Sequence, residues 1–206
     1  MRRPALRRRA FGDAAAWRPA ELHPAEPPAG ARVRLRLLLR ADRDEFLALA
    51  ADSRELHRPW TYPPERADQF EELYARSRRE DFTCLLATVR ETGEIAGVFT
   101  VSQIVRGAFQ SAYLGYYAHQ RLARQGYMAE AMEQLLDHAF GALALHRLEA
   151  NIQPGNEASI ALARGCGFRL EGFSPRYLLI GGQWRDHERY AITADEHAAT
   201  KASEAA

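Results

Sequence analysis

The chain has 206 residues, of which 47% are hydrophobic and 27% charged, and its formal net charge is +1. This length holds one domain with a hydrophobic core, and the composition is that of an ordinary globular protein. A net charge this close to zero excludes a strong nonspecific attraction to nucleic acid or to membranes.

Two cysteines, Cys84 and Cys166, give neither a disulfide framework nor a metal-binding spacing. The sequence also lacks the apolar stretch of a secretory signal and any apolar run long enough to span a membrane. We therefore expect a cytoplasmic protein, monomeric or homodimeric, in which both thiols are buried as small apolar side chains.

The two ends of the chain differ in composition from its middle. Residues 1–31 are rich in Arg, Ala and Pro without periodicity, which predicts a disordered or loosely docked extension. A basic arm that contacts RNA is the alternative interpretation of this extension. Residues 195–206 are predicted to form a short frayed tail, which leaves residues 32–194 as the domain.

The first half of the domain begins with a strand, because Val33, Leu35, Leu37 and Leu39 alternate with mostly arginines. Asp42 then stands at the N-cap position of a helix whose apolar face includes Phe46, Leu47, Ala50 and Ala51. A proline-rich turn leads to a second helix, and two strands joined by a hairpin turn follow. We place these later elements at about residues 66–79, 82–89 and 95–103.

The second half alternates strands and helices. It contains a strand at 113–118, a helix at about 127–140, a strand at 147–152, a helix from Asn156 to Gly165 or Gly167, and strands at 168–173 and 184–192. This order predicts an α+β fold, in which helices flank a mixed sheet.

The turn between the strand at 113–118 and the next helix is the first candidate site. Such a turn aims unpaired backbone N–H groups and the positive end of the helix at one point, which suits an anion such as phosphate. Gly126 is the glycine of this turn, where a side chain would crowd the anion.

Four segments in order make the chain resemble the GNAT superfamily of N-acetyltransferases, and within it the RimJ type of ribosomal-protein-alanine N-acetyltransferase. They comprise residues 57–60, 104–116, 156–172 and 177–187. The resemblance covers about residues 32–192. It implies a central twisted, mostly antiparallel sheet of six to seven strands, splayed in the middle and flanked by about four helices.

The resemblance implies acetyl-CoA as co-substrate, bound between the strands at 113–118 and 147–152. The superfamily's pyrophosphate loop, Gln/Arg-x-x-Gly-x-Gly/Ala, falls on residues 123–128, and only Gly126 matches it. Main-chain groups near Tyr116 and Ala118 are expected to pair with the pantetheine arm, and Asn156 either contacts that arm or only caps its helix. The full expected coenzyme set is Tyr116, Tyr117, Ala118, Arg124, Gln125, Gly126, Tyr127, Met128 and Asn156.

Catalytic residues transfer less directly. Many relatives use a Glu base and a Tyr acid at the positions that Asn151 and Ala163 occupy here. Glu149, two residues before Asn151 and on the same face of its strand, is a substitute base or a structural carboxylate. Ser159 either stabilises the departing thiolate, as in related enzymes, or is a simple helix-start hydroxyl.

The absence of a strong base favours an acceptor that is easy to deprotonate. An α-amino group has a pKa near ~8, whereas a lysine amine lies near ~10.4. The resemblance and this chemistry together predict acetylation of a protein N-terminus, of the ribosomal-protein-alanine type. A small amine such as an antibiotic or polyamine is the alternative acceptor, and a non-catalytic acetyl-CoA-binding regulatory protein is a third interpretation.

The acceptor is expected to lie between the first helix pair and the last hairpin. The candidate residues there are Trp60, Tyr177, Trp184, Arg185 and Asp186. For Trp60 and Trp184 core or hinge packing is the alternative, and Asp186 either holds a terminal ammonium or pairs with Arg185. Cys166 is interpreted as a buried structural thiol rather than as an acetyl carrier.

Overall fold

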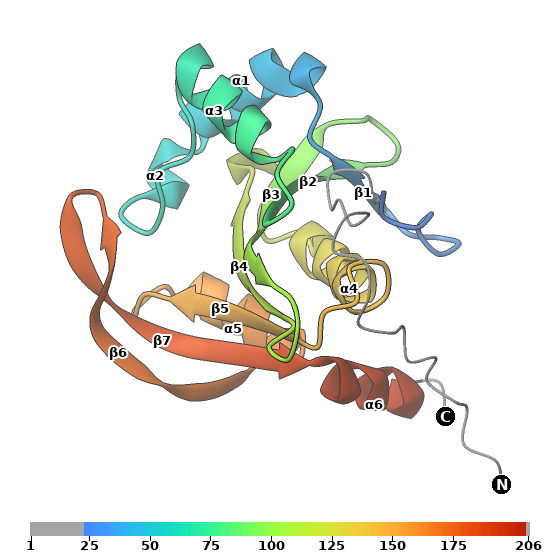
Figure 1. Ribbon diagram of the computed structural model, residues 1–206. Helices are drawn as coiled ribbons and strands as arrows, with labels where there is room; N and C mark the ends of the chain where they lie inside the picture. Colours follow the sequence, from blue (N-terminus) through green and yellow to red (C-terminus); the bar gives the residue numbers. More distant parts are fainter. Residues whose placement is uncertain (1–22, 205–206) are drawn as a thin grey trace, which may run out of the picture.

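The computed structural model describes residues 23–204, and a single seven-stranded sheet of order β1-β2-β3-β4-β5-β7-β6 runs through it (Figure 1). The strands are β1 Val33–Leu37, β2 Phe82–Val89, β3 Ile95–Val105, β4 Ser111–Ala118, β5 Arg147–Ile152, β6 Arg169–Ile180 and β7 Gln183–Thr193. The helices are α1 Arg43–Asp52, α2 Arg54–His57, α3 Ala67–Arg76, α4 Tyr127–Phe140, α5 Glu157–Gly165 and α6 Ala194–Glu204. This arrangement confirms the predicted α+β fold. The sheet is mixed, because β4 and β5 run parallel while the other neighbouring pairs run antiparallel.

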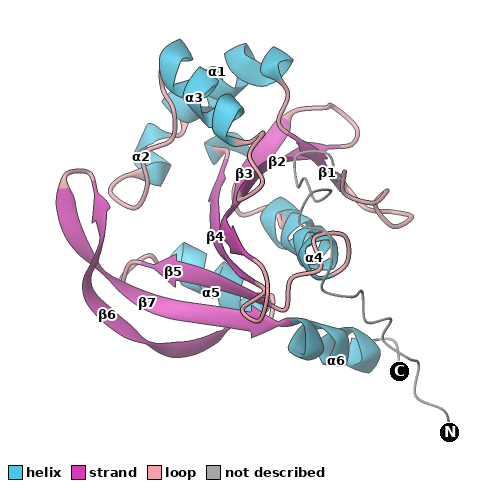
Figure 2. Cartoon of the chain, viewed as in Figure 1, coloured by secondary structure: helices cyan, strands magenta, loops and turns pink. Residues whose placement is uncertain are grey.

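Both faces of the sheet are covered by helices in its first half. Strand β2 is buried at every position, and its residues alternate between two apolar clusters. Leu85 and Ala87 pack in the cluster that includes α4 and α5, whereas Cys84 and Leu86 pack beneath α1 and α3. The long β6–β7 hairpin extends beyond this core and curves back toward α2 (Figure 2).

Helix α4 is the central support of the sheet. Its buried residues are Ala131, Met132, Leu135, Leu136, His138 and Ala139, which form one continuous stripe at helical spacing. The observed helix has the predicted bounds, 127–140. It starts immediately after the candidate anion turn, so its packing fixes that turn against the sheet.

Two local expectations need correction. Asp42 holds the predicted N-cap position of α1, but its carboxylate does not cap the helix; it accepts the Leu39 N–H at 2.7 Å and pairs with the guanidinium of Arg36, a residue of β1, at 2.7 Å. Residues 194–204 form helix α6 rather than a frayed tail. His197 and Lys201 of that helix reach the Asp137 carboxylate at 2.9 and 2.5 Å, so polar contacts dock the helix on α4.

The predicted N-terminal extension lies mostly outside the described residues, which start at residue 23. Within the described part of the chain, no helix is long and apolar enough to cross a membrane.

Candidate active site

The middle of the sheet opens between β4 and β5. The two strands pair only from Ser111 to Tyr113 on β4 and from Arg147 to Glu149 on β5, and they diverge beyond these residues (Figure 1). This opening confirms the predicted splay. Beyond Tyr113, the edge of β4 that faces β5 has no paired strand, although it lies at the centre of the protein.

Main-chain groups of β4 face this opening. The His119 N–H donates to the Ala96 carbonyl on the β3 side at 2.8 Å, so by alternation the main-chain groups of Ala118 and Tyr116 point away from β3. The Ala118 carbonyl, however, accepts a hydrogen bond from His57 Nε2 at 2.8 Å. Ala118 therefore offers mainly its N–H to a ligand, because the carbonyl that was expected to pair with the pantetheine arm is bound to His57.

The turn before α4 has the backbone of an anion site. Arg124 and Gly126 both adopt the left-handed conformation, with φ of +61° and +84°. Gly126 is the N-cap of α4, and the N–H groups of the first helical turn that follows have no partners within the helix. Successive N–H groups in such a turn converge on one point, which a negatively charged group can occupy.

An arginine that the sequence analysis did not single out lies beside this turn. The Arg32 guanidinium donates to the Gln125 carbonyl at 3.1 Å and to Glu130 at 3.0 Å, and it lies 4.8 Å from the centre of the Tyr127 ring. Glu130 also accepts the main-chain N–H groups of Arg32 and Val33, so it joins β1 to α4. Arg32 therefore stabilises the turn, and the Glu130 carboxylate balances most of its positive charge.

The remaining predicted coenzyme residues divide by exposure. Arg124 and Gln125 are exposed, as contacts to a surface pyrophosphate require. Met128 instead packs against Gly97, where an added Cβ would lie 2.2 Å from its sulfur atom. Tyr117 turns its ring toward Phe46 and His57 in the core, and burial raises its pKa well above the usual value. For Met128, main-chain contact with a coenzyme is the remaining possibility. Tyr117 pairs with Val98 of β3 through its main chain, so neither its ring nor its main chain faces the opening, and its expected contact with the coenzyme is not supported.

A cavity of about 440 Å³ continues from the opening toward the β6–β7 hairpin. Its walls come from β3, β4, β5, the start of α5, the loop at Trp60 and the hairpin. Among the described residues, its lining includes no Asp, Glu, Lys or Arg. Hydroxyl, amide, aromatic and aliphatic groups line it instead, together with His187.

The hairpin meets the loop after α2 at one side of this cavity. A Cβ built on Gly181, at the hairpin turn, would lie 2.4 Å from the Tyr62 hydroxyl, so the hairpin turn and the Tyr62 side chain are in close contact. Trp60 lines the cavity from the same loop, and its carbonyl accepts a hydrogen bond from Gln153 at 2.9 Å. The cavity is therefore bridged on this side.

Asn156 and Ser159 lie where the opening meets the cavity, and both line it. The side-chain Oδ1 of Asn156 accepts the Ser159 N–H at 3.3 Å, so Asn156 caps α5. The Ser159 hydroxyl donates to the Tyr116 hydroxyl at 2.9 Å, which in turn donates to the Ser159 carbonyl at 2.9 Å. Burial raises the pKa of Tyr116 to about 12, so this hydroxyl keeps its proton at neutral pH.

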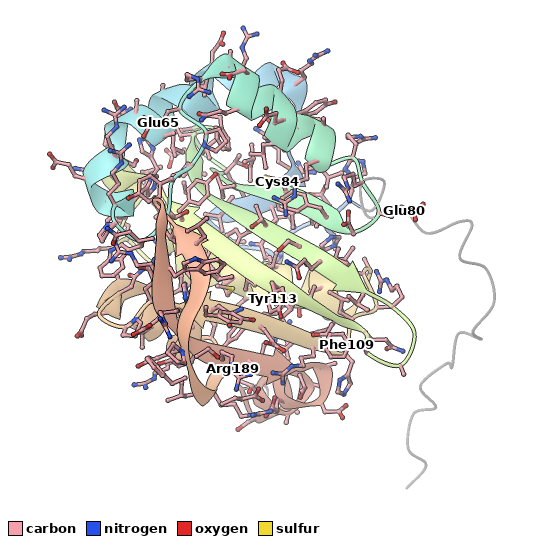
Figure 3. The ribbon with its side chains drawn as sticks, turned by 60° about the vertical axis from the view of Figure 1, so that its left-hand side comes forward. Glu65, Glu80, Cys84, Phe109, Tyr113 and Arg189 are labelled. Carbon is pink, nitrogen blue, oxygen red and sulfur yellow. The ribbon has the colours of Figure 1, made fainter. Side chains whose placement is uncertain are left out.

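Glu149 does not reach the cavity. Its carboxylate accepts a hydrogen bond from Arg147 Nε at 3.0 Å, and Arg147 also pairs with Glu171. Tyr113, its neighbour across β4 and β5, does line the cavity, and Figure 3 shows Tyr113 and Arg189 on the same side of the sheet. The expectation that Glu149 replaces the missing base is therefore not supported by its geometry, since the carboxylate serves an ion-pair network.

The five predicted acceptor residues separate by position, and Arg185 does not line the cavity. Trp60 and Tyr177 line the cavity. Trp184 is 61% exposed and pairs with Leu179 on the hairpin, outside the lining. The Asp186 carboxylate accepts the Arg176 N–H at 2.7 Å, which stabilises the irregular pairing between Ser174 and Leu178 rather than a ligand.

Two further residues at the cavity, to which the sequence alone assigned no role, stand out in the structure. His187 is 2% exposed, and its ring lies 6.0 Å from the Tyr177 ring in an edge-to-face arrangement. Asn151 lines the same cavity with a buried side-chain oxygen that has no hydrogen-bond partner. Cys166 is buried, and burial raises the pKa of its thiol to about 12, in agreement with an unreactive structural role.

The profile of the acetyltransferase (GNAT) domain family matches residues 32–169. The probable N-acetyltransferase YjcK of Bacillus subtilis is 29% identical over 174 residues, which is 79% of this chain and 94% of that protein. The ribosomal protein uS5-alanine N-acetyltransferase of Escherichia coli is 41% identical over 103 residues, which is 50% of this chain and 53% of that protein.

Solved structures agree with this assignment. Mycobacterium smegmatis RimJ, in complex with CoA-disulfide, superposes with a TM-score of 0.73 at 28% identity and covers 83% of this chain and 89% of its own. Spermidine N-acetyltransferase of Vibrio cholerae, with CoA and spermine, superposes with a TM-score of 0.70 over 81% of this chain and 98% of its own, but its 22% identity shows the fold alone. The splayed strands, the N–H groups before α4 and the adjoining cavity fit acetyl-CoA as co-substrate. This chain is an acetyl-CoA-dependent N-acetyltransferase that belongs to the GNAT family.

Proposed function

We propose that this enzyme acetylates the α-amino group at the N-terminus of a protein, of the alanine type found in ribosomal proteins. The observation that carries the proposal is the uncharged lining of the acceptor cavity among the described residues. A protein N-terminus brings one ammonium group and then neutral peptide groups, which hydroxyl and amide side chains can pair with. An alanine methyl fits beside the apolar side chains of Trp60, Leu178 and Ile180.

A polyamine is the less favourable acceptor for this cavity. Such a substrate carries several positive charges, and each must be desolvated or paired on entry. The cavity lining supplies no carboxylate for them in the part of the chain that the structure describes. The spermidine acetyltransferase that shares the fold therefore supports the architecture and not the substrate.

Ser159 and Tyr116 are proposed to serve the leaving group. Their two hydroxyls lie 2.9 Å apart at the junction between the opening and the cavity, where a thioester has to pass. A hydroxyl that donates to a developing thiolate stabilises it, and the neighbouring hydroxyl can resupply the proton. Tyr116, expected from the sequence to act through its main chain, thereby also contributes its side chain.

The test compares acceptors directly. Purified enzyme and acetyl-CoA are incubated with peptides that begin with Ala, Ser or Met, with the same peptides blocked at the N-terminus, and with spermidine. We expect turnover of the free Ala peptide and none of its blocked form. Turnover of spermidine alone would refute the proposal. Mass spectrometry of protein N-termini from cells with and without the gene then tests whether a ribosomal protein is the acceptor.

A further inference from the structure

We propose that His187 is the general base of this enzyme and that Asn151 orients the amine toward it. The inference rests on the proposed function only in requiring an amine acceptor in the cavity, and it applies to a peptide and to a small amine alike. It assigns a base to a site in which the usual position holds Asn151 and in which Glu149 is bound to Arg147.

The hydrogen bond of His187 fixes its tautomer. His187 Nδ1 lies 3.0 Å from the Arg185 carbonyl oxygen, which can only accept, so Nδ1 carries the proton. In the neutral ring, Nε2 then bears the lone pair. The side chain is thus held in the protonation form that a general base requires.

The fold places this ring on the same side of the sheet as Asn151. Asn151 pairs with Arg189 across β5 and β7, and His187 is two residues from Arg189 on the same strand. Residues two apart on a strand share a face, so His187 is a diagonal neighbour of Asn151, about 7 Å away by the geometry of such pairs. Both residues line the cavity, and the proposal places the acceptor nitrogen between them.

Asn151 supplies an independent indication that a donor binds here. Its side-chain oxygen is buried and has no hydrogen-bond partner. A buried acceptor without a partner loses the free energy of its hydration, and proteins rarely leave one uncompensated. An amine N–H that donates to this oxygen satisfies it and directs the nitrogen lone pair, which is the role of a positioning residue.

The surroundings of His187 keep its ring neutral. Burial lowers the pKa of His187, and the Arg185 carbonyl and the neighbouring Asp186 carboxylate offset part of this effect. The titratable group that faces the ring from β6 is Tyr177, whose hydroxyl lies 3.4 Å from the Tyr113 hydroxyl of β4. The hydrogen bond with Tyr177 and burial raise the pKa of Tyr113 to about 12, so the Tyr113 hydroxyl is uncharged at neutral pH and does not stabilise an imidazolium.

The reaction accounts for each of the three protons of the acceptor ammonium group. The ammonium group enters with three protons and passes one to His187 Nε2, which later releases it to solvent. The neutral nitrogen forms a bond to the acetyl carbon, and the carbon–sulfur bond breaks with its electron pair on sulfur. A second proton leaves the nitrogen and, by way of the hydroxyls of Ser159 and Tyr116, reaches the sulfur. The third proton stays on the product amide.

The first experiment measures kcat and KM for His187→Ala with the acceptor that the wild-type enzyme uses best, with and without added imidazole. We expect kcat/KM to fall about a hundredfold or more, as for loss of a general base, and imidazole to restore part of kcat. The matched control is His138→Gln, which alters another buried histidine outside the cavity, and it should retain kcat and show no imidazole effect. Wild-type kcat/KM in His187→Ala, or a loss that imidazole leaves unchanged, would overturn the inference.

Asn151→Ala separates orientation from proton transfer. We expect a higher KM for the acceptor, an unchanged Kd for acetyl-CoA and an unaltered inflection in the pH profile. A shifted inflection would contradict the positioning role.

A second measurement decides the inference without any acceptor. NMR of the ¹⁵N-labelled histidine ring should show the proton on Nδ1 and a pKa below the ordinary value near ~6.5. A proton on Nε2 at neutral pH, or a raised pKa, would refute the base even if the enzyme acetylates protein N-termini. Conversely, an enzyme that acetylates only small amines, with rescue of His187→Ala by imidazole, would refute the proposed function and support the base.

Discussion

The candidate phosphate site makes a sharp prediction at Gly126. Its φ of +84° lies in the left-handed region, where an L-residue with a Cβ costs about 1–2 kcal/mol. An added Cβ would lie 3.0 Å from Arg32 Nη2, which is the end of a flexible side chain and can move away. Gly126→Ala should therefore lower the unfolding free energy by about 1–2 kcal/mol, mainly through backbone strain. Gly126→Glu adds a negative charge beside the pyrophosphate.

The magnitude for the charged variant follows from electrostatics. Two like charges about 4 Å apart repel by about 1 kcal/mol in water and about 4 kcal/mol near a protein surface. A repulsion of about 3 kcal/mol, between these limits, weakens binding of acetyl-CoA about a hundredfold. Gly93 is the matched control, because its φ of +80° imposes the same strain with nothing within 4 Å of an added Cβ.

The assay combines thermal unfolding with calorimetric titration of acetyl-CoA. We expect Gly93→Glu and Gly126→Glu to lose similar stability, and only Gly126→Glu to lose affinity. Equal affinity of the two variants for acetyl-CoA would show that the phosphates bind elsewhere.

Three further predictions concern single side chains. Burial lowers the pKa of His138 to about 4. Between pH 6.5 and 4 the unfolded chain therefore binds more protons than the folded protein, and the unfolding free energy should fall by about 2 kcal/mol from pH 7 to pH 5. His138→Leu should remove this dependence in urea titrations at the two pH values, and an undiminished slope would exclude His138 as its source. Tyr116→Phe should lower kcat about tenfold or more and leave the Kd of acetyl-CoA within twofold, and a normal kcat would show that Ser159 acts without its partner. Asp137→Asn should lower the unfolding free energy by no more than about 1 kcal/mol, because the carboxylate that holds α6 is half exposed. A loss several times larger would show that the docking of α6 contributes far more to stability than an exposed ion pair does.

The sequence predicted those elements whose apolar pattern is strong. The helix at 127–140 and the strand at 147–152 have the predicted bounds, because each carries an apolar stripe that packs in the main core. Helix α6 was missed for the opposite reason. It is held by His197 and Lys201 on Asp137, and polar contacts between distant segments leave no periodicity to detect.

In the candidate site, too, the sequence predicted local contacts and missed contacts between distant segments. Asn156 was expected as a helix cap from its local sequence, and it is one. The Ser159–Tyr116 contact joins residues 43 positions apart, so the role of the tyrosine hydroxyl depends on the tertiary fold. The sequence placed His187 in a family motif but gave it no role of its own. Its proposed role as a base depends on burial and on the hydrogen bond to the Arg185 carbonyl, and neither can be read from a sequence.

The acidity of the acceptor ammonium group also favours a protein N-terminus over a lysine side chain. Burial lowers the pKa of His187, which has to take a proton from a group with a pKa of about 8 at a protein N-terminus, so this transfer is uphill. The same transfer from a lysine side chain, with a pKa of about 10.4, costs about 3 kcal/mol more, whatever the strength of the base. The difference of about 3 kcal/mol corresponds to roughly a two-hundredfold preference for the α-amine, before any contact in the cavity contributes. A peptide with a free N-terminal alanine and an internal lysine should therefore be acetylated almost only at its N-terminus, as mapped by tandem mass spectrometry. Comparable modification of the lysine would mean that contacts in the cavity outweigh this difference in acidity.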